Sequence, residues 1–139
     1  WAIVQNRPPK QTDTLTHWLV AHEKGNRTEV FDAPKEGAQK AVLKYRVIAE
    51  GERYHLLEVE LLTGRKHQIR AQLSHIGCPI KGDLKYGARR SNPGGGISLQ
   101  SHRICFQHPV SKLEIDITAP IPPQPLWQAL AAAASEQKK

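Results

Sequence analysis

The chain has 139 residues, and its 20 lysines and arginines outnumber its 13 aspartates and glutamates, which gives a formal net charge of +7. This balance favours an anionic partner, most commonly a nucleic acid, over a basic surface that serves only solubility. No apolar run approaches the roughly 20 residues needed to cross a bilayer, so we expect no membrane-spanning segment. The length suits one domain with a substantial core.

The cysteines and histidines give no metal-ligand spacing. Cys78 and Cys105 are far apart, and no Cys-x-x-Cys or His-x-x-x-His motif is present, so we expect neither a zinc site nor a disulfide scaffold. A reducing, cytoplasmic compartment fits this cysteine usage. Apart from His67, six histidines are scattered along the chain, and the sequence assigns none to a metal: His17, His22, His55, His75, His102 and His108.

Alternation of apolar and polar residues predicts a protein built mainly from strands. A turn at Glu50-Gly51-Glu52 predicts that the strands on either side of it form an antiparallel hairpin. Near the C-terminus, Leu113, Ile115 and Ile117 alternate with polar residues, which predicts a half-buried strand. The expected strands, in chain order, are Trp1–Gln5, Thr28–Phe31, Ala41–Ile48, Tyr54–Leu62, Leu99–Phe106 and Leu113–Thr118.

One segment, Thr14–His22, fits two patterns. Leu15, Trp18 and Leu19 suit the buried stripe of a helix, whereas Leu15, His17 and Leu19 suit one face of a strand. The sequence alone leaves both interpretations open.

Helices are fewer. Ile69, Leu73 and Ile76 recur at helical spacing and predict a short helix that ends at Gly77 and Pro79. An alanine-rich helix is expected over Leu126–Ala134, and loops are expected over Asn6–Asp13 and residues 89–96. The sequence therefore predicts an α+β domain whose sheet is mainly antiparallel and mixed, with a few short helices.

The run Leu62–Arg70 concentrates three cations and a histidine around the start of the first predicted helix. Backbone N–H groups at such a start lack intrahelical partners and favour anions. Arg65 and Lys66 would add positive charge, and Gly64 would permit close approach of a ligand to the backbone. Solvated charge explains two isolated cations equally well, but the combination predicts a phosphate-binding corner.

Arg70 lies about a quarter turn from the apolar stripe of this helix. A guanidinium at that border either pairs with a carboxylate or phosphate, or extends over the apolar rim into water. His67 would serve as a hydrogen-bond donor or as a structural histidine. Asp83 is expected to cap or close a turn, and Tyr86 is expected to be buried, although it could instead stack on a base.

These residues resemble a known family. The run Leu62–Arg70, followed by Ile76–Asp83 and Tyr86-Gly87, resembles the C-terminal signature of RluA-type RNA pseudouridine synthases. Two further segments resemble other parts of the same domain: Leu99–Pro109 its late strand motif, and Trp1–Val4 the strand after a family tyrosine. The resemblance covers almost the whole chain and implies a pseudouridine synthase fold.

The resemblance implies isomerisation of uridine to pseudouridine in rRNA or tRNA, without a metal or cofactor. The family's catalytic aspartate lies in a His-Arg-Leu-Asp motif that this chain lacks, and the active-site tyrosine would precede Trp1. The chain is therefore expected to be the C-terminal part of a catalytic domain, inactive alone. Arg70 matches the family arginine that pairs with that aspartate, whereas Gln72 stands where many relatives have histidine.

RNA is the expected partner, and a second copy of the chain is a further candidate partner because a cut sheet exposes an edge. The alternatives for function are a non-catalytic RNA-binding module on the same scaffold and a basic structural domain with no RNA role. The expected RNA-binding residues are Arg65, Lys66, His67, Gln68, Lys85, Arg89 and Arg90.

Overall fold

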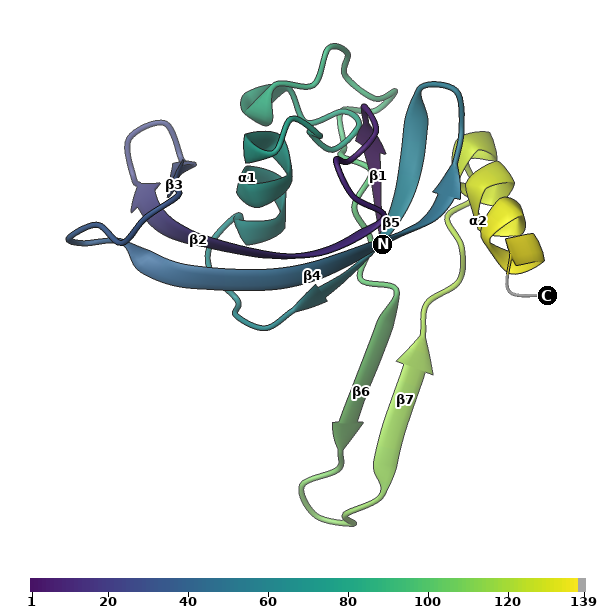
Figure 1. Ribbon diagram of the computed structural model, residues 1–139. Helices are drawn as coiled ribbons and strands as arrows, with labels where there is room; N and C mark the ends of the chain where they lie inside the picture. The colour runs from purple at the N-terminus through teal and green to yellow at the C-terminus, as the bar shows by residue number, and fades with distance from the viewer. Residues whose placement is uncertain (138–139) are drawn as a thin grey trace.

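The computed structural model describes residues 1–137 and confirms the α+β class (Figure 1). Five strands form a sheet in the order β1-β5-β4-β2-β3, and two more form a separate hairpin. The strand pairs in this part of the chain are antiparallel. The strands are β1 (Ala2–Gln5), β2 (Thr12–His22), β3 (Arg27–Phe31), β4 (Gln39–Glu50), β5 (Tyr54–Leu61), β6 (Arg103–Gln107) and β7 (Glu114–Thr118). The helices are α1 (Gln68–His75), the short 3-10 helix η1 (Leu84–Tyr86) and α2 (Pro125–Gln137).

The ambiguous segment Thr14–His22 is a strand. It lies within β2, which pairs with β3 on one side and β4 on the other. Leu15, His17 and Leu19 are buried, whereas Trp18 is only partly buried. The period-2 pattern therefore decides the conformation, because it is the one that places the apolar residues against α1.

The predicted hairpin is formed by β4 and β5, and its register shifts between Val47 and Ala49. A bulge of this kind interrupts the alternation of a strand, so that two consecutive residues can face the same side of a sheet. Val47 belongs to the core on one face, and Ile48 and Ala49 belong to the core on the other. β1 is buried on both faces, with Ala2 and Val4 on the first side and Ile3 on the second.

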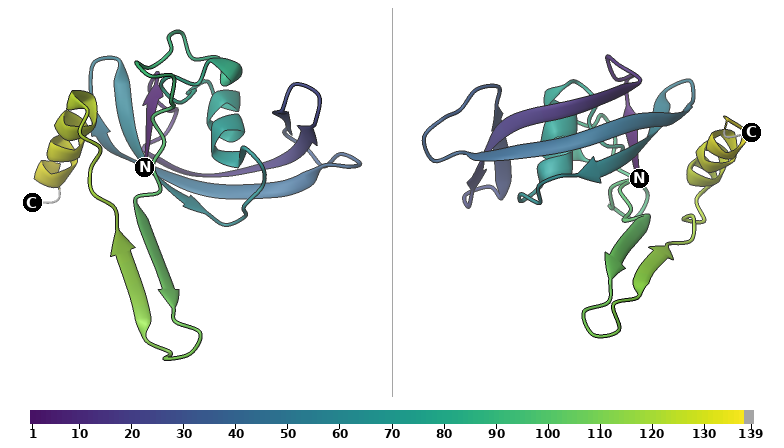
Figure 2. Two further views of the ribbon diagram at one scale, coloured as in Figure 1. Left: turned by 180° about the vertical axis from the view of Figure 1, so that it is seen from behind. Right: turned by 60° about the horizontal axis from the view of Figure 1, so that its bottom comes forward.

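The two helices cover opposite faces of the sheet (Figures 1 and 2). On the first face, Leu73 of α1 packs with Leu43 and Leu57. On the second face, Trp127 and Leu130 of α2 complete a smaller core. Sheet residues are thus covered on both sides where β1, β4 and β5 meet, which fixes the surroundings of α1.

The end of α1 follows its sequence signals. Gly77 adopts a φ of 88°, and its N–H bonds to the carbonyl of Ser74. The N–H of Cys78 bonds to the carbonyl of Leu73, which completes a Schellman motif. The prediction that Gly77 ends this helix is confirmed.

The β6–β7 hairpin departs from the expectation. The predicted strand Leu99–Phe106 begins only at Arg103, and Leu99 makes an isolated bridge to Ala2. The strand predicted near the C-terminus is present as β7, but its expected burial is wrong, because Leu113 is 69% exposed and Ile117 is 56% exposed, while Ile115 is only partly buried. The hairpin projects away from the five-stranded sheet (Figure 2), so the sheet does not cover these apolar positions.

Both cysteines are free. Cys78 lies in the core, where burial raises the pKa of its thiol to about 11. Cys105 lies exposed on β6 and donates to Glu114. Among residues 1–137, no helix combines the length and the apolar character needed to cross a membrane.

Candidate functional site

The centre of the site is an ion pair between Arg70 on α1 and Asp83, the residue before η1. The Nε of Arg70 donates to Oδ2 of Asp83 at 2.9 Å, and an Nη donates to Oδ1, also at 2.9 Å. The Asp83 side chain is 1% exposed and that of Arg70 is 22% exposed. The two bonds raise the pKa of Arg70, and this bidentate geometry holds the plane of the guanidinium.

This pair resolves the two alternatives for Arg70. The guanidinium does not simply extend into water, because Asp83 holds it at the border of the core. The carboxylate partner expected from the sequence lies outside the chain, whereas the structure supplies one from within it. Contact with an upstream aspartate stays a prediction.

A glycine positions Asp83. Gly82 has a φ of 87°, and a Cβ at this residue would lie 2.5 Å from the side chain of Asn92 and 2.7 Å from the carbonyl of Gly96. Only glycine fits both the backbone conformation and the space. The expected capping role of Asp83 is corrected, since its side chain makes no cap hydrogen bond. Its carbonyl instead accepts from Tyr86 and Ala88 and closes the turn.

The ring of Tyr86 packs beneath the guanidinium of Arg70. Its ring is buried, as expected, and the guanidinium carbon of Arg70 lies 4.9 Å from the ring centre. Its hydroxyl accepts from the N–H of Thr28 at 2.8 Å and lies 2.9 Å from Nδ1 of His67. Arg27 lies over the same ring at 5.2 Å. The ring therefore packs against the two guanidinium groups and is not free to stack on a base.

His67 links the loop before α1 to the hydroxyl of Tyr86. It adopts a left-handed backbone with a φ of 54° and precedes the first helical residue. Burial and the neighbouring charges of Arg70, Lys66 and Lys85 lower the pKa of His67. The imidazole is consequently neutral at pH 7, and its bond to Tyr86 supports the structural interpretation.

Gln68 does not lie on an RNA-accessible surface. Its side chain is buried, its Oε1 accepts from the N–H of Arg65 and the hydroxyl of Thr63, and its Nε2 donates to the carbonyl of Val42. The amide thus fastens the loop to β4. We assign Gln68 a structural role in place of the predicted RNA contact.

The predicted cations near the start of α1 differ in solvent exposure and in hydrogen bonding. Lys66 is exposed, whereas Arg65 is partly buried and its Nε donates to the carbonyl of Lys40 at 3.0 Å. Lys85 is exposed and donates to the carbonyl of Asn26 at 3.1 Å. Lys66 and Lys85 lie close enough to His67 to lower its pKa, and Arg27, which sequence patterns did not single out, lies over the same Tyr86 ring as Arg70.

Arg89 and Arg90 belong to a second group. They line a cavity of about 560 Å³, together with two further arginines, Arg7 and Arg53. The N–H of Arg89 bonds to the side-chain oxygen of Gln5, which anchors this loop to the end of β1. The structure therefore divides the predicted RNA-binding residues between the start of α1 and this arginine-lined cavity.

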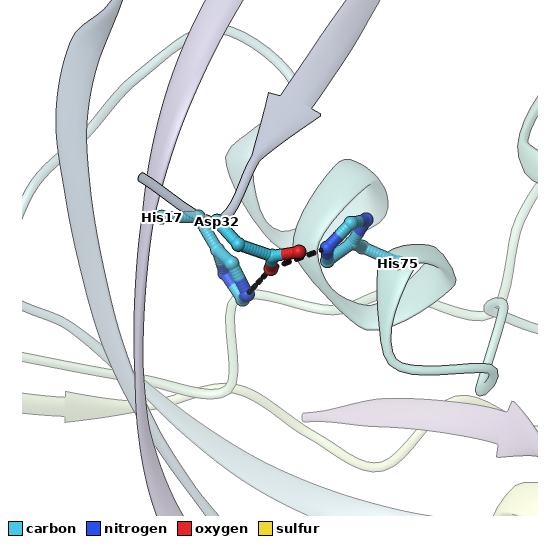
Figure 3. Close-up of side chains that lie close together, drawn as sticks. All are labelled: His17, Asp32 and His75. Carbon is cyan, nitrogen blue, oxygen red and sulfur yellow. Dashed lines mark hydrogen bonds and ion pairs between the residues drawn. The ribbon is translucent and has the colours of Figure 1, made fainter. Parts of the chain in front are cut away.

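Two histidines that look scattered in the sequence lie together. The rings of His17 and His75 are 4.9 Å apart, and Asp32 contacts both (Figure 3). Sequence patterns do not reveal this arrangement, because it depends on which strands pair and where α1 packs. A signal existed only for His17, on the inward face of β2 if that segment was a strand.

We predict that Asp83→Asn destabilises the fold by about 3 kcal/mol, because it leaves a largely buried guanidinium without its counter-charge. Unfolding in urea measures this change. The matched control is Arg46→Gln, which breaks an exposed pair with Glu58 and should cost no more than about 1 kcal/mol. Equal losses for the two variants would show that Asp83 is not the charge partner that holds Arg70.

Comparison with known proteins assigns the chain to a family. A family model described as RNA pseudouridylate synthase matches residues 1–75, more than half of the 139 residues, and includes Arg70. Ribosomal large subunit pseudouridine synthase D of Xylella fastidiosa is 38% identical over 119 residues, covering 76% of this chain and 34% of that protein. tRNA pseudouridine synthase C of Pectobacterium carotovorum is 33% identical over 125 residues, covering 82% of this chain and 32% of that protein.

Solved structures agree on the fold. Human RNA pseudouridylate synthase domain containing 1 superposes with a TM-score of 0.73 at 21% identity, over 93% of this chain and 56% of that one. The chain spans about a third of the length of the two relatives named above, at 34% and 32%. Motifs, family model and fold lead to one conclusion: the chain belongs to the RluA-type RNA pseudouridine synthase family.

Proposed function

We propose that this chain forms the C-terminal part of the catalytic domain of a cytoplasmic RNA pseudouridine synthase, acting on uridine in rRNA or tRNA. The single observation that carries the proposal is the ion pair of Arg70 and Asp83, set among cations in a chain of this family. An upstream segment would supply the catalytic aspartate and the tyrosine, so this chain alone would be inactive.

The geometry of Arg70 suits a second carboxylate. A guanidinium has five N–H bonds in one plane, and Asp83 takes two of them. Asp83 and the ring of Tyr86 hold that plane in place, and the side chain retains 22% exposure. A catalytic aspartate that accepts from the remaining edge would be kept ionised and aimed at the nucleotide.

The reaction needs no redox partner. The bond from the ribose to N1 of the uracil ring breaks and one to C5 forms, while C5 loses a proton and N1 gains one, so no electrons enter or leave overall. The base must leave the RNA stack to react, and the phosphates on either side then need a positively charged surface. Lys66 and Lys85, exposed near His67, and the partly buried Arg65 would contribute to such a surface, and Arg89 and Arg90 would supply another in the arginine-lined cavity.

The alternative is a non-catalytic RNA-binding module on the same scaffold. The same cations support it, because phosphate binding needs only charge. The two functions differ in the role of Arg70, which matters for chemistry in the enzyme and only for stability in the binding module.

We predict that Arg70→Lys in the whole protein lowers the rate of pseudouridine formation by about 100-fold, because an ammonium keeps the charge but cannot hold two carboxylates in one plane. Tritium release from RNA labelled at C5 of uridine measures the rate. Circular dichroism and RNA affinity establish that the variant is folded and still binds.

Arg46→Gln is the control, since it removes an exposed cation from β4 outside the site. The proposal is contradicted if Arg70→Lys and Arg46→Gln retain equal activity. RNA binding without product from the unaltered whole protein would favour the binding module instead.

We further predict that Lys66→Gln combined with Lys85→Gln weakens RNA binding. It should also lower the slope of log affinity against log salt by about 1 for each lysine that neutralises a phosphate. Fluorescence anisotropy across a salt series measures the slope. Lys44→Gln is the matched control, because Lys44 is exposed on β4 opposite Glu60. An unchanged slope in the double variant would remove these two lysines from the RNA interface.

A further inference from the structure

A compact group of three potential ligands lies at the far end of α1 from the predicted phosphate-binding corner. Nε2 of His75 lies 2.8 Å from Oδ1 of Asp32, and Nε2 of His17 lies 3.7 Å from the same oxygen. All three ligand atoms lie within 4.8 Å of one another. Figure 3 shows the carboxylate between the two imidazoles.

The fold dictates this meeting. Trp18 of β2 is opposite Phe31 of β3, so His17 and Asp32 extend from neighbouring positions of adjacent strands. His75 comes from the last turn of α1, which packs on both strands. His17 is 7% exposed, whereas the Asp32 side chain is 80% exposed. The group therefore has a fixed inner ligand and an adaptable outer one.

We propose that His17, Asp32 and His75 form a binding site for a divalent transition metal ion, with Zn²⁺ as the best-fitting ion. Two imidazoles and one carboxylate are ligands that Zn²⁺ takes at about 2.0–2.2 Å, and tetrahedral ligands at such distances lie roughly 3.3 Å apart. The two separations from the Asp32 oxygen, 2.8 and 3.7 Å, bracket that value. The remaining position would hold water on the exposed side.

A buried amide lies beside His17, the inner ligand. Gln72 is fully buried, its Nε2 lies 2.8 Å from Nδ1 of His17, and its Oε1 has no hydrogen-bond partner among residues 1–137. Ligation through Nε2 of His17 requires the proton on Nδ1, and a metal-bound imidazole normally donates that proton to an acceptor. The Nε2 of Gln72 also lies 3.4 Å from the carbonyl oxygens of Leu15 and Ala41, so the amide would have to turn and give up these two contacts before Oε1 could accept from Nδ1.

The proposed ion would hold three segments of the fold together. This proposal does not depend on the pseudouridine synthase function. The ion would join β2, the segment after β3 and the end of α1, the helix that carries Arg70. By contrast, the nearby pair of His22 and Glu29 on the same strands offers two ligands at 3.0 Å and no third among the described residues. That pair provides the matched control.

The test is calorimetric titration with Zn²⁺ at pH 7.5, in a Cys105→Ser background that removes the exposed thiol. We expect one bound ion, and we expect His75→Ala and Asp32→Asn each to weaken binding by about 10-fold or more. His22→Ala should leave the affinity unchanged. Asp32→Asn changes a highly exposed side chain, so its effect cannot arise from a damaged core.

Nitrogen-15 spectra of the histidine rings provide a second measurement. Zn²⁺ should shift the Nε2 signals of His17 and His75, and the proton of His17 should move to Nδ1. The proposal is overturned if these signals do not respond, if His75→Ala and Asp32→Asn bind Zn²⁺ as well as the parent does, or if His22→Ala weakens binding equally. Those results would leave an ordinary surface ion pair.

Discussion

The site depends on one buried carboxylate that holds one guanidinium. Asp83 is almost fully buried and accepts two hydrogen bonds from Arg70. Removing two charges from water is costly, and only a near-ideal bidentate geometry compensates for that cost. The backbone turn at Gly82 positions Asp83, and the ring of Tyr86 packs against the guanidinium of Arg70, so both support this geometry. The pair therefore constrains the backbone on both sides of it.

The rest of the fold supports α1, which carries this arginine. Leu73 anchors the helix in the first core, and Gln68 fastens its start to β4. At its other end, His75 reaches Asp32 and His17. A single eight-residue helix thus presents the predicted catalytic group in its first turn and the proposed metal ligand at its end. Movement of α1 against β2 would alter both places together.

Local patterns predicted local structure well. The alternation in β4, the turn that joins it to β5, and the glycine that ends α1 each depend on neighbours in sequence, so the sequence revealed them. Contacts between residues distant in sequence were harder to predict. Asp83 was predicted to be a turn residue because its ion-pair partner lies 13 positions away, too far for a local pattern to show it. Gln68 was predicted to contact RNA because it stands in a basic motif, although its side chain is buried. The exposed face of β7 was mispredicted because alternation shows which residues share a face, not whether another layer covers it.

The most direct measurement is the crystal structure of the whole protein that carries this chain. Our account predicts an upstream aspartate whose carboxylate oxygen lies about 2.7–2.9 Å from an Arg70 nitrogen, while Asp83 keeps its two bonds to the opposite edge. A structure in which no second carboxylate approaches Arg70, and the guanidinium serves Asp83 alone, would contradict it.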